Sequence, residues 1–452
     1  MAVKKIRFNA FTMNSTTHQS PGLWRHPNNR SGEHNSIEYW QNLARLLEKG
    51  LFDAVFIADV MGVYDVYKGN AQASIKGGVQ FPVHDPLLIV PVMAAVTQNL
   101  GFGVTFSLTY EHPFPFARRM STLDHLTNGR VGWNIVTGYL DSAARSLGLD
   151  KQLDHDQRYD LADEYLEVLY KLWEHSWEDE AIIKDPDTAQ YLDAQKIHKI
   201  DHQGKYFTLS AYHLTEPSPQ RTPVLFQAGT SARGRTFSAR HAECVFISGP
   251  TKSVIRKMAS DLRESLRASG RSPHEQLIYA QALLIVDVDS QRAREKLDDY
   301  IRHIDFESAI SLLSGWTGLD LSDLKPDQVI EYIENNAGRS ALASFTRSNP
   351  NHKWTVAEAV KFIGLGGRGP IIVGSPAEVA GQLEEWIDET GVDGFNLTYG
   401  IAPGDFSAVI ELLIPELQQR GRYPQAYSDG TLRHKLFGQG NRIRNNGTST
   451  PR

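Results

Sequence analysis

Short runs of β-branched and aromatic residues alternate with amphipathic helical stretches over nearly the whole chain. Strands that alternate with helices are typical of a parallel sheet whose strands are joined by crossover helices. The segments predicted to be strands are residues 5–13, 52–59, 100–108, 131–137, 222–229, 243–249, 277–287 and 393–400. Eight strands in this rhythm predict an α/β protein with the (β/α)8 fold, the TIM barrel.

Two long segments interrupt this alternation. The first, at about 139–221, follows the fourth predicted strand and combines a helix with a polar part rich in His, Asp and Lys. The second, at about 305–370, follows the seventh strand and contains turn sequences such as SNPNHK and GLGGRGP. Loops of this length are usually functional, and in a barrel both would lie over the same rim. We interpret 1–438 as one barrel domain with two insertions, and the Gly/Asn-rich residues 439–452 as a disordered tail.

Composition and charge exclude several classes of protein. The chain has 452 residues, of which 41% are apolar, and α/β barrels reach this size as a single unit. A net charge of −6, with acidic and basic residues mixed along the chain, argues against binding to nucleic acid or to a membrane surface. No apolar run approaches about 18 residues, the length needed to span a membrane.

Cysteine and histidine usage bear on location and metal binding. Cys244 is the only cysteine, which excludes an intrachain disulfide and a multi-thiolate metal site. The N-terminus enters a short strand directly and shows no secretory signal, so we expect a cytoplasmic protein. None of the 16 histidines has convincing ligand spacing, and no metal site is predicted.

Polar residues collect at the ends of the predicted strands. They are Asp59, Ser107, Asn134 with Thr137, Gln227, Ser248, and Asn396 with Tyr399. Each one alone is explained equally well as a cap of the following helix. Their repetition at the C-terminal ends of the strands, where TIM barrels build active sites, favours a pocket. Asn134 interrupts the apolar run VGWNIVT, so its amide is either bonded to the backbone or faces something other than core.

The sequence GTSARGRTFSAR, at 229–240, is a candidate phosphate site. A Gly-containing turn follows a strand there and opens an amphipathic helix. Backbone N–H groups at a helix start, the hydroxyls of Thr230 and Ser231 and the nearby Arg233 suit a phosphate. The alternative is a serine that only caps the helix.

Two further motifs are ambiguous or misleading. Gly364, Gly366 and Gly369 spell G-x-G-x-x-G, but they follow a helix and precede a strand, the reverse of a dinucleotide site. In HDQRYD, His155 and Tyr159 lie four residues apart at the start of a helix and share one face. From these residues alone a solvated helix start is the better interpretation.

Several ordered motifs carry a resemblance to a known family. They are GLWRHP (22–27), EKGLFDAVFIAD (48–59), FARRMSTLDHLTNGRVGWNIVT (116–137), DHDQRYDLADEYLEVLYKLW (154–173), HQGKYF (202–207), SPQRTPVLFQAGTSARGR (218–235) and GTLRHKL (430–436). From end to end the chain resembles flavin-dependent monooxygenases of the bacterial luciferase-like superfamily, in the branch of nitrilotriacetate, pristinamycin and dibenzothiophene-sulfone monooxygenases. NAFTMN, FIADVMGVYDVY and EPSPQRTPVLFQAG look most like the dimethylsulfide monooxygenase large subunit and enzymes acting on S-alkylated cysteines.

The resemblance implies an activity. A barrel of this kind would bind FMN as FMNH2, supplied by a separate NAD(P)H-dependent flavin reductase, and would use O2 as co-substrate. The expected substrate is a small organosulfur compound whose C–S bond is cleaved, and the expected assembly is a homo-dimer or homo-tetramer. Alternatives are a deazaflavin-dependent dehydrogenase, a monooxygenase of aminopolycarboxylates or sulfones, and a flavin-binding protein without activity.

The resemblance also implies roles for individual residues, without an acid or base among them. Asp59, Ser107 and Asn134 would approach the flavin ring. The ribityl-phosphate chain would be held by His155, Tyr159, Thr230 and Ser231. The substrate side would be lined by His18, Trp24 and Tyr64.

Overall fold

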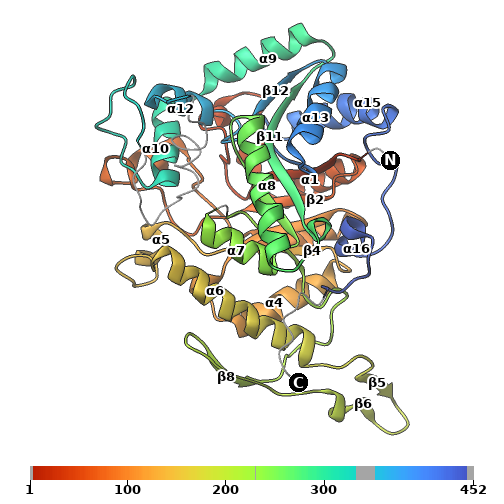
Figure 1. Cartoon of the computed structure of the whole chain (residues 1–452). Helices are drawn as coiled ribbons and strands as arrows, with labels where there is room; N and C mark the ends of the chain where they lie inside the picture. Colours follow the sequence, from red (N-terminus) through yellow and green to blue (C-terminus); the bar gives the residue numbers. More distant parts are fainter. Residues whose placement is uncertain (1–3, 230, 332–351, 445–452) are drawn as a thin grey trace.

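The computed structural model describes residues 4–229, 231–331 and 352–444, and its centre is a closed parallel barrel. Hydrogen bonding connects the strands in the circular order β1, β2, β3, β4, β9, β10, β11, β13 and back to β1 (Figure 1). Their bounds are β1 Arg7–Met13, β2 Ala54–Ala58, β3 Gly101–Ser107, β4 Val131–Val136, β9 Val224–Gln227, β10 Cys244–Ile247, β11 Leu277–Val286 and β13 Gly394–Thr398. The (β/α)8 prediction is confirmed, because each of the eight predicted segments supplies one barrel strand.

Helices surround this barrel (Figure 1). Between the first five barrel strands lie α1 Ile37–Lys49, α2 Gln72–Gly77, α3 Val90–Ala94, α4 Pro113–Leu126, α5 Asp141–Ser146 and α6 His155–Tyr170. The later ones are α7 Ala232–His241, α8 Lys252–Ala268, α9 Ser290–His303, α10 Phe306–Thr317, α12 Val356–Ile363, α13 Pro376–Thr390, α14 Gly404–Ala408, α15 Ile414–Gln419 and α16 Leu432–Phe437. Side chains cap many of their N-termini, as Thr251 caps α8 by accepting from Val254 N at 3.4 Å.

Phenylalanines fill the lower part of the barrel interior. Phe56 and Phe246 lie 4.1 Å apart between ring centroids, and Phe226 stacks on Phe246 at 5.5 Å. Glycines on neighbouring strands make room for these rings, since a Cβ at Gly103 would lie 2.6 Å from Phe56 Cδ2, and one at Gly132 would overlap Phe226. The rings therefore form a solid floor beneath the C-terminal end of the barrel.

The two insertions differ in structure. After α6 the first insertion forms two antiparallel hairpins that extend away from the barrel, at the bottom of Figure 1. Their strands are β5 Ile182–Asp185, β6 Gln190–Leu192, β7 Ile200–Gln203 and β8 Thr208–Ala211. These hairpins were not predicted, because β5 and β6 are mostly exposed and the alternation of buried and exposed residues in β7 spans only four residues. The second insertion contributes α10 and α12, with residues 332–351 outside the described part, and the strand-like PIIVG that follows forms β12 (Ile371–Gly374) beside β11.

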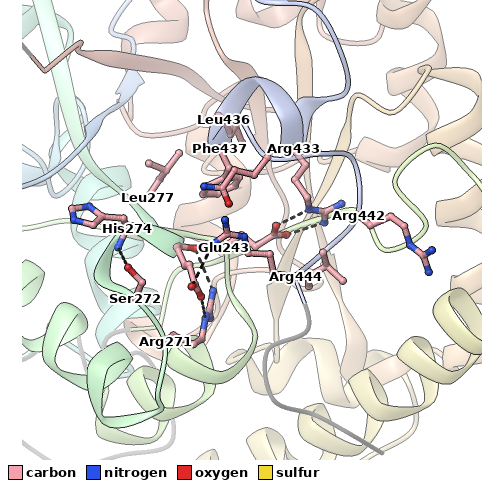
Figure 2. Close-up of a pocket in the computed structure, with 13 residues that line it drawn as sticks. Glu243, Arg271, Ser272, His274, Leu277, Arg433, Leu436, Phe437, Arg442 and Arg444 are labelled. Carbon is pink, nitrogen blue, oxygen red and sulfur yellow. Dashed lines mark hydrogen bonds and ion pairs between the residues drawn. The ribbon is translucent and has the colours of Figure 1, made fainter. Parts of the chain in front are cut away.

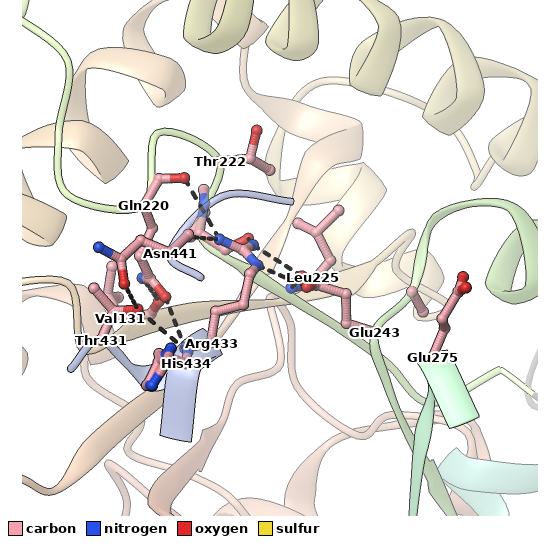
Figure 3. Close-up of polar contacts among 12 residues, drawn as sticks. Val131, Gln220, Thr222, Leu225, Glu243, Glu275, Thr431, Arg433, His434 and Asn441 are labelled. Carbon is pink, nitrogen blue, oxygen red and sulfur yellow. Dashed lines mark hydrogen bonds and ion pairs between the residues drawn. The ribbon is translucent and has the colours of Figure 1, made fainter. Parts of the chain in front are cut away.

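The N-terminal end of the barrel is closed by α16. Arg433 donates to both carboxylate oxygens of Glu243, at 2.7 and 2.9 Å, and also to the backbone carbonyls of Pro223 and Asn441 (Figure 3). Leu432 and Leu436 pack under the phenylalanine floor. Within the described residues, no helix has both the length and the apolar character that crossing a bilayer requires.

The predicted tail at 439–452 is only partly described. Residues 445–452 lie outside the described part of the chain, so disorder there stays a prediction. Residues 439–444 run along the N-terminal end of the barrel, where Arg442 binds Glu174 at 2.9 Å and Arg444 lies 3.5 Å from Glu275 (Figure 2).

Candidate active site

A cavity of about 300 Å³ lies at the C-terminal end of the barrel, above the phenylalanine floor. Its walls come from residues at or just after the ends of several strands, and from both insertions. The polar side chains that converge on it are His18, Gln19, Asp59, Gln80, Thr105, Asn134, Gln227, Ser248, Gln281, Arg368 and Asn396. Except for Ser107 and Tyr399, the strand-end polar residues thus surround one pocket, the arrangement expected of a TIM-barrel active site.

Asn134 lines this cavity from the middle of β4. Its Nδ2 donates to Thr105 Oγ1 on the adjacent β3 at 2.9 Å, which fixes the orientation of the amide. Its Oδ1 is buried and has no partner, and the same holds for Gln227 Oε1 and Asn396 Oδ1. Buried acceptors without partners are costly, so three of them around one pocket indicate a ligand that donates hydrogen bonds.

Asp59 lines the cavity directly after β2. Burial, together with the nearby Asp85, raises the pKa of the Asp59 carboxyl to about 7, although a hydrogen bond from Val60 N opposes the shift. A carboxyl group with such a pKa is able both to donate and to accept a proton at neutral pH.

The residues predicted to bind the ribityl-phosphate chain come together where α6 and α7 begin. Ser231 caps α7, and its Oγ lies 3.3 Å from His155 Nε2. Tyr159, one turn after His155, lines the cavity, and its hydroxyl accepts from Gln227 Nε2 at 3.5 Å. The backbone at Gly229 approaches so closely that a Cβ there would overlap the Tyr159 hydroxyl. The cavity therefore extends to the N-terminus of a helix, a position that favours anions.

Arg233 was predicted to help bind the phosphate, but its guanidinium is engaged elsewhere. Its guanidinium binds Asp160 at 3.0 Å and Asp163 at 2.7 Å, so its charge is already compensated by two carboxylates. Thr230 lies outside the described residues, and its role stays a prediction.

An aromatic cluster lines the side of the cavity that the two insertions form. The Tyr64 hydroxyl donates to Gln80 Oε1 at 2.8 Å, receives a hydrogen bond from Trp316 Nε1 at 3.2 Å, and lies 2.6 Å from the Tyr139 hydroxyl. The guanidinium carbon of Arg368 lies 5.4 Å from the centre of the Trp316 ring, within range of a cation–π interaction.

The other predicted site residues fall in different places. His18 lines the cavity beside Gln19, and burial lowers the pKa of its imidazole to about 3, so the ring is neutral at physiological pH. Trp24 does not line the cavity, because its indole is 43% exposed and donates to Gly77 O on the outer surface. Ser107 is buried at the end of β3, also outside the cavity lining, and its hydroxyl has no partner.

Sequence reasoning did not select four of the cavity residues, namely Gln80, Gln281, Trp316 and Arg368. Gln80, Trp316 and Arg368 come from a loop and from the second insertion, where no strand pattern marks which side chains turn inward, whereas Gln281 lies on β11. The available signals were Gln281, a polar residue inside an apolar strand, and Arg368, a basic residue inside the glycine turn GLGGRGP between two apolar segments.

His26, Asp299 and His303 form a separate cluster of metal-ligand type outside the cavity. His26 Nε2 lies 2.9 Å from Asp299 Oδ2, while His26 Nδ1 accepts a hydrogen bond from Asn28 N at 3.2 Å. With Nδ1 accepting, the proton of the neutral ring sits on Nε2 and is donated to Asp299. This cluster is therefore explained as a hydrogen-bond network.

The cavity residues fit a flavin. The face of a flavin ring is flat and largely apolar, and its edge carries both N–H and C=O groups. The phenylalanine floor suits that face, the unpartnered oxygens of Asn134, Gln227 and Asn396 suit N–H donors on the edge, and the start of α7 suits a phosphate.

Comparisons with known proteins agree with this fit. A family model described as luciferase-like monooxygenase matches residues 11–394. The chain is 47% identical over 435 residues to a dimethyl-sulfide monooxygenase of Hyphomicrobium sulfonivorans, covering 96% of this chain and 91% of that one. It is 46% identical over 438 residues to a long-chain alkane monooxygenase of Geobacillus thermodenitrificans, covering 97% and 95%. A riboflavin lyase solved with modified FMN and riboflavin superimposes with a TM-score of 0.92 at 34% identity, covering 98% of each chain.

Proposed function

This chain belongs to the luciferase-like monooxygenase family, and from that premise we propose that it is the oxygenase component of a two-component system. It binds FMNH2 supplied by a separate NAD(P)H-dependent reductase and uses O2 to oxidise a small organosulfur compound. The observation that carries this proposal is the set of three buried, unpartnered amide oxygens around one cavity with an apolar floor.

In this proposal, different side chains bind the ring of the flavin and its phosphate-bearing chain. Asn134, Gln227 and Asn396 would orient the flavin ring through its N–H groups, while Tyr159 and Ser231 would hold the chain that ends in phosphate. Bound reduced FMN would supply the two electrons that allow one oxygen atom of O2 to enter the substrate and the other to leave as water. Asp59, with its pKa of about 7, would hold or release a proton at the cavity wall.

The need for a separate reductase is supported by the glycine motif at 364–369. Those glycines form a turn between α12 and β12, so they do not open a helix after a strand as a nicotinamide site requires. In the proposed system the protein takes its electrons from a flavin that was reduced elsewhere.

The organosulfur assignment rests on the relatives and on cavity size. The two relatives of similar identity act, by their names, on dimethyl sulfide and on long-chain alkanes. A cavity of about 300 Å³ lies at the lower end of the range of ligand sites, about 300 to 1,000 Å³, and must hold a flavin ring as well. A short thioether is therefore favoured over a long chain, and hydroxylation beside its sulfur would cleave the C–S bond.

Anaerobic titration tests the cofactor. Binding of FMNH2 and of FMN is followed by fluorescence, and we expect markedly tighter binding of the reduced form. Equal affinity for the two forms would contradict the proposal. Hydride transfer to a deazaflavin without O2 would instead identify a dehydrogenase.

A substrate screen tests the reaction. With a generic flavin reductase, O2 uptake and product are measured for dialkyl sulfides, S-alkyl cysteines, sulfones and aminopolycarboxylates. Oxidation of the first two groups is expected, and activity on aminopolycarboxylates alone would refute the organosulfur assignment. Flavin binding without substrate-dependent product in any group would identify a flavin-binding protein without activity.

Location and assembly complete the proposal. We propose a cytoplasmic protein, because its single cysteine, Cys244, is a free and buried thiol. A homo-dimer or homo-tetramer is expected, and light scattering coupled to size-exclusion chromatography measures which of them forms.

A further inference from the structure

Arg368 is the one basic side chain, apart from the neutral His18, among the described residues that line the cavity. Across the described ranges 4–229, 231–331 and 352–444, no carboxylate pairs with its guanidinium, and no carbonyl or hydroxyl accepts a hydrogen bond from it. Its guanidinium lies over the face of Trp316. Within the described residues, the five N–H donors of this arginine therefore face the cavity without a protein acceptor.

The turn that carries Arg368 is held rigidly against the barrel. Gly366 and Gly367 have φ of +75° and +78°, the left-handed region that favours glycine. Gly366 O accepts hydrogen bonds from Gln281 Nε2 on β11 at 2.7 Å and from Thr398 Oγ1 on β13 at 3.2 Å. These contacts explain the glycine-rich sequence and fix Arg368 over the cavity without a nucleotide.

Neutral groups surround the guanidinium. Burial lowers the pKa of Arg368, and the hydroxyls of Tyr64 and Tyr139 oppose that shift only partly, yet arginine stays a cation at neutral pH. Burial raises the pKa of Tyr139 to about 12, so neither tyrosine supplies a negative charge. Asp59 lines the same cavity but forms no ion pair with Arg368 in the described structure. A partly buried cation without an anion is unfavourable, so the missing anion is expected to arrive with a ligand.

The phosphate end is served by other residues. Tyr159, Gly229 and Ser231 belong to α6 and to the turn before α7, whereas Arg368 contacts Trp316 of α10. Among the described residues, no hydrogen bond or ring contact joins Arg368 to that group. The anion near Arg368 is therefore a second one, at the aromatic side of the cavity.

We propose that Arg368 binds a carboxylate of the substrate, which makes an anionic thioether a better substrate than a neutral dialkyl sulfide. This inference rests on the proposed function and specifies its substrate class. The planar guanidinium matches a carboxylate in a bidentate pair, and the face of Trp316 keeps the guanidinium in place. The sulfur end of the substrate would then point away from Arg368, toward the barrel centre where Asn134 lies.

A binding experiment tests Arg368 independently of turnover. Propionate is titrated into the protein with and without FMN, and the fluorescence of the tryptophans, which include Trp316, is recorded. Saturable quenching is expected for the natural protein, and an affinity about tenfold weaker or more for Arg368→Gln, because charge-assisted hydrogen bonds are strong. Arg302→Gln is the matched control, since Arg302 is exposed on α9. Equal propionate affinity in the natural protein and Arg368→Gln would overturn the proposal.

A turnover experiment tests the substrate class. Diethyl sulfide and (ethylthio)acetate are compared at a fixed FMNH2 supply, and the ratio of their kcat/KM values is measured. The natural protein should prefer the carboxylate, and Arg368→Gln should reduce that preference about tenfold or more, chiefly through KM, with partial recovery in Arg368→Lys. An unchanged ratio, or a loss that follows a weaker affinity for FMNH2, would overturn the inference and place Arg368 beside the flavin. If neither thioether is oxidised, the organosulfur proposal fails, while the propionate titration still decides the role of Arg368.

Discussion

Arg433 lies at the N-terminal end of the barrel, where its guanidinium donates hydrogen bonds to the Glu243 carboxylate and to three backbone carbonyls (Figure 3). Arg368 lies at the opposite end, over the ring of Trp316, and the part of the chain that the structure describes gives its guanidinium no hydrogen bond or ion pair. Arg271, Arg442 and Arg444 line a pocket with Arg433 at this end of the barrel, called the lower pocket below (Figure 2). They also bind protein carbonyls or carboxylates. Arginine thus stabilises the fold at the N-terminal end of the barrel, and at the C-terminal end its guanidinium remains available to bind a ligand.

The largest effect is expected for Arg433→Met. Removing one partner of a buried ion pair leaves Glu243 charged and unpaired, and such changes cost about 3 to 5 kcal/mol of unfolding free energy. Urea unfolding measures the loss. Arg302→Met, which removes an exposed arginine paired with Asp299, should cost about 0.5 kcal/mol or less. A similar cost for both substitutions would mean that the lower pocket does not depend on its ion pair.

Asp59→Asn should stabilise the cofactor-free protein at neutral pH. The pKa of Asp59 is about 7 in the folded protein, compared with 3.8 as its ordinary value. The folded state therefore binds the proton more tightly, and the stability falls as the pH rises from about 4 to about 7. Asparagine removes this dependence, and we expect a gain of about 2 kcal/mol at pH 8, because water in the cavity reduces the full effect. Parallel unfolding curves for both proteins between pH 5 and 8 would contradict the raised pKa.

Asn134→Leu tests the upper cavity for flavin binding. Losing one hydrogen-bond acceptor should weaken FMNH2 binding by about tenfold, corresponding to about 1.4 kcal/mol. The unfolding free energy should change less than that, because Asn134 Oδ1 has no protein partner to lose, and the apolar surface that leucine buries offsets the lost hydrogen bond from Nδ2 to Thr105 Oγ1. The two quantities are measured by anaerobic titration and by urea unfolding. A large loss of stability with normal flavin affinity would make Asn134 a structural residue.

The smallest effect is expected for the stability of Arg368→Met. This substitution removes the cation–π contact with Trp316, worth about 0.5 to 1 kcal/mol, and also removes an uncompensated charge. The unfolding free energy should therefore stay within about 1 kcal/mol of the natural protein, measured beside Arg433→Met under the same conditions. A loss of several kcal/mol would show that both ends of the barrel use arginine in the same way.

The barrel was predictable because each of its strands is a short apolar run that can be recognised in the sequence without knowledge of its neighbours. The same pattern placed Asn134, Asp59 and Gln227 at strand ends, and they line the cavity. The hairpins at 182–211 escaped prediction, because β5 and β6 are largely exposed and the alternation of β7 and β8 extends over only four residues in each strand.

Arg368 shows why part of the site could not be predicted. Sequence context correctly argued against a dinucleotide motif at 364–369. Those glycines form a turn that is held by hydrogen bonds from Gln281 and Thr398, which lie far from the turn along the chain. Trp24 shows the opposite case, since its position after the first strand suggested the substrate side while its indole lies on the surface. The positions of Arg368 and Trp24 both depend on how loops fold over the rim of the barrel, and hydrophobic periodicity does not predict the conformation of loops.

The closure of the barrel has a consequence for how the protein is made. β1 pairs with β13, and Glu243 meets its partner on α16, so both ends of the structure are completed by segments synthesised last. A ribosome delivers the chain from the N-terminus, and domains fold as their residues become available. The barrel can close only after β13 has been made, and Glu243 gains its ion-pair partner only after Arg433 has followed. A fragment that stops before residue 394 would therefore leave one edge of β1 without a neighbouring strand.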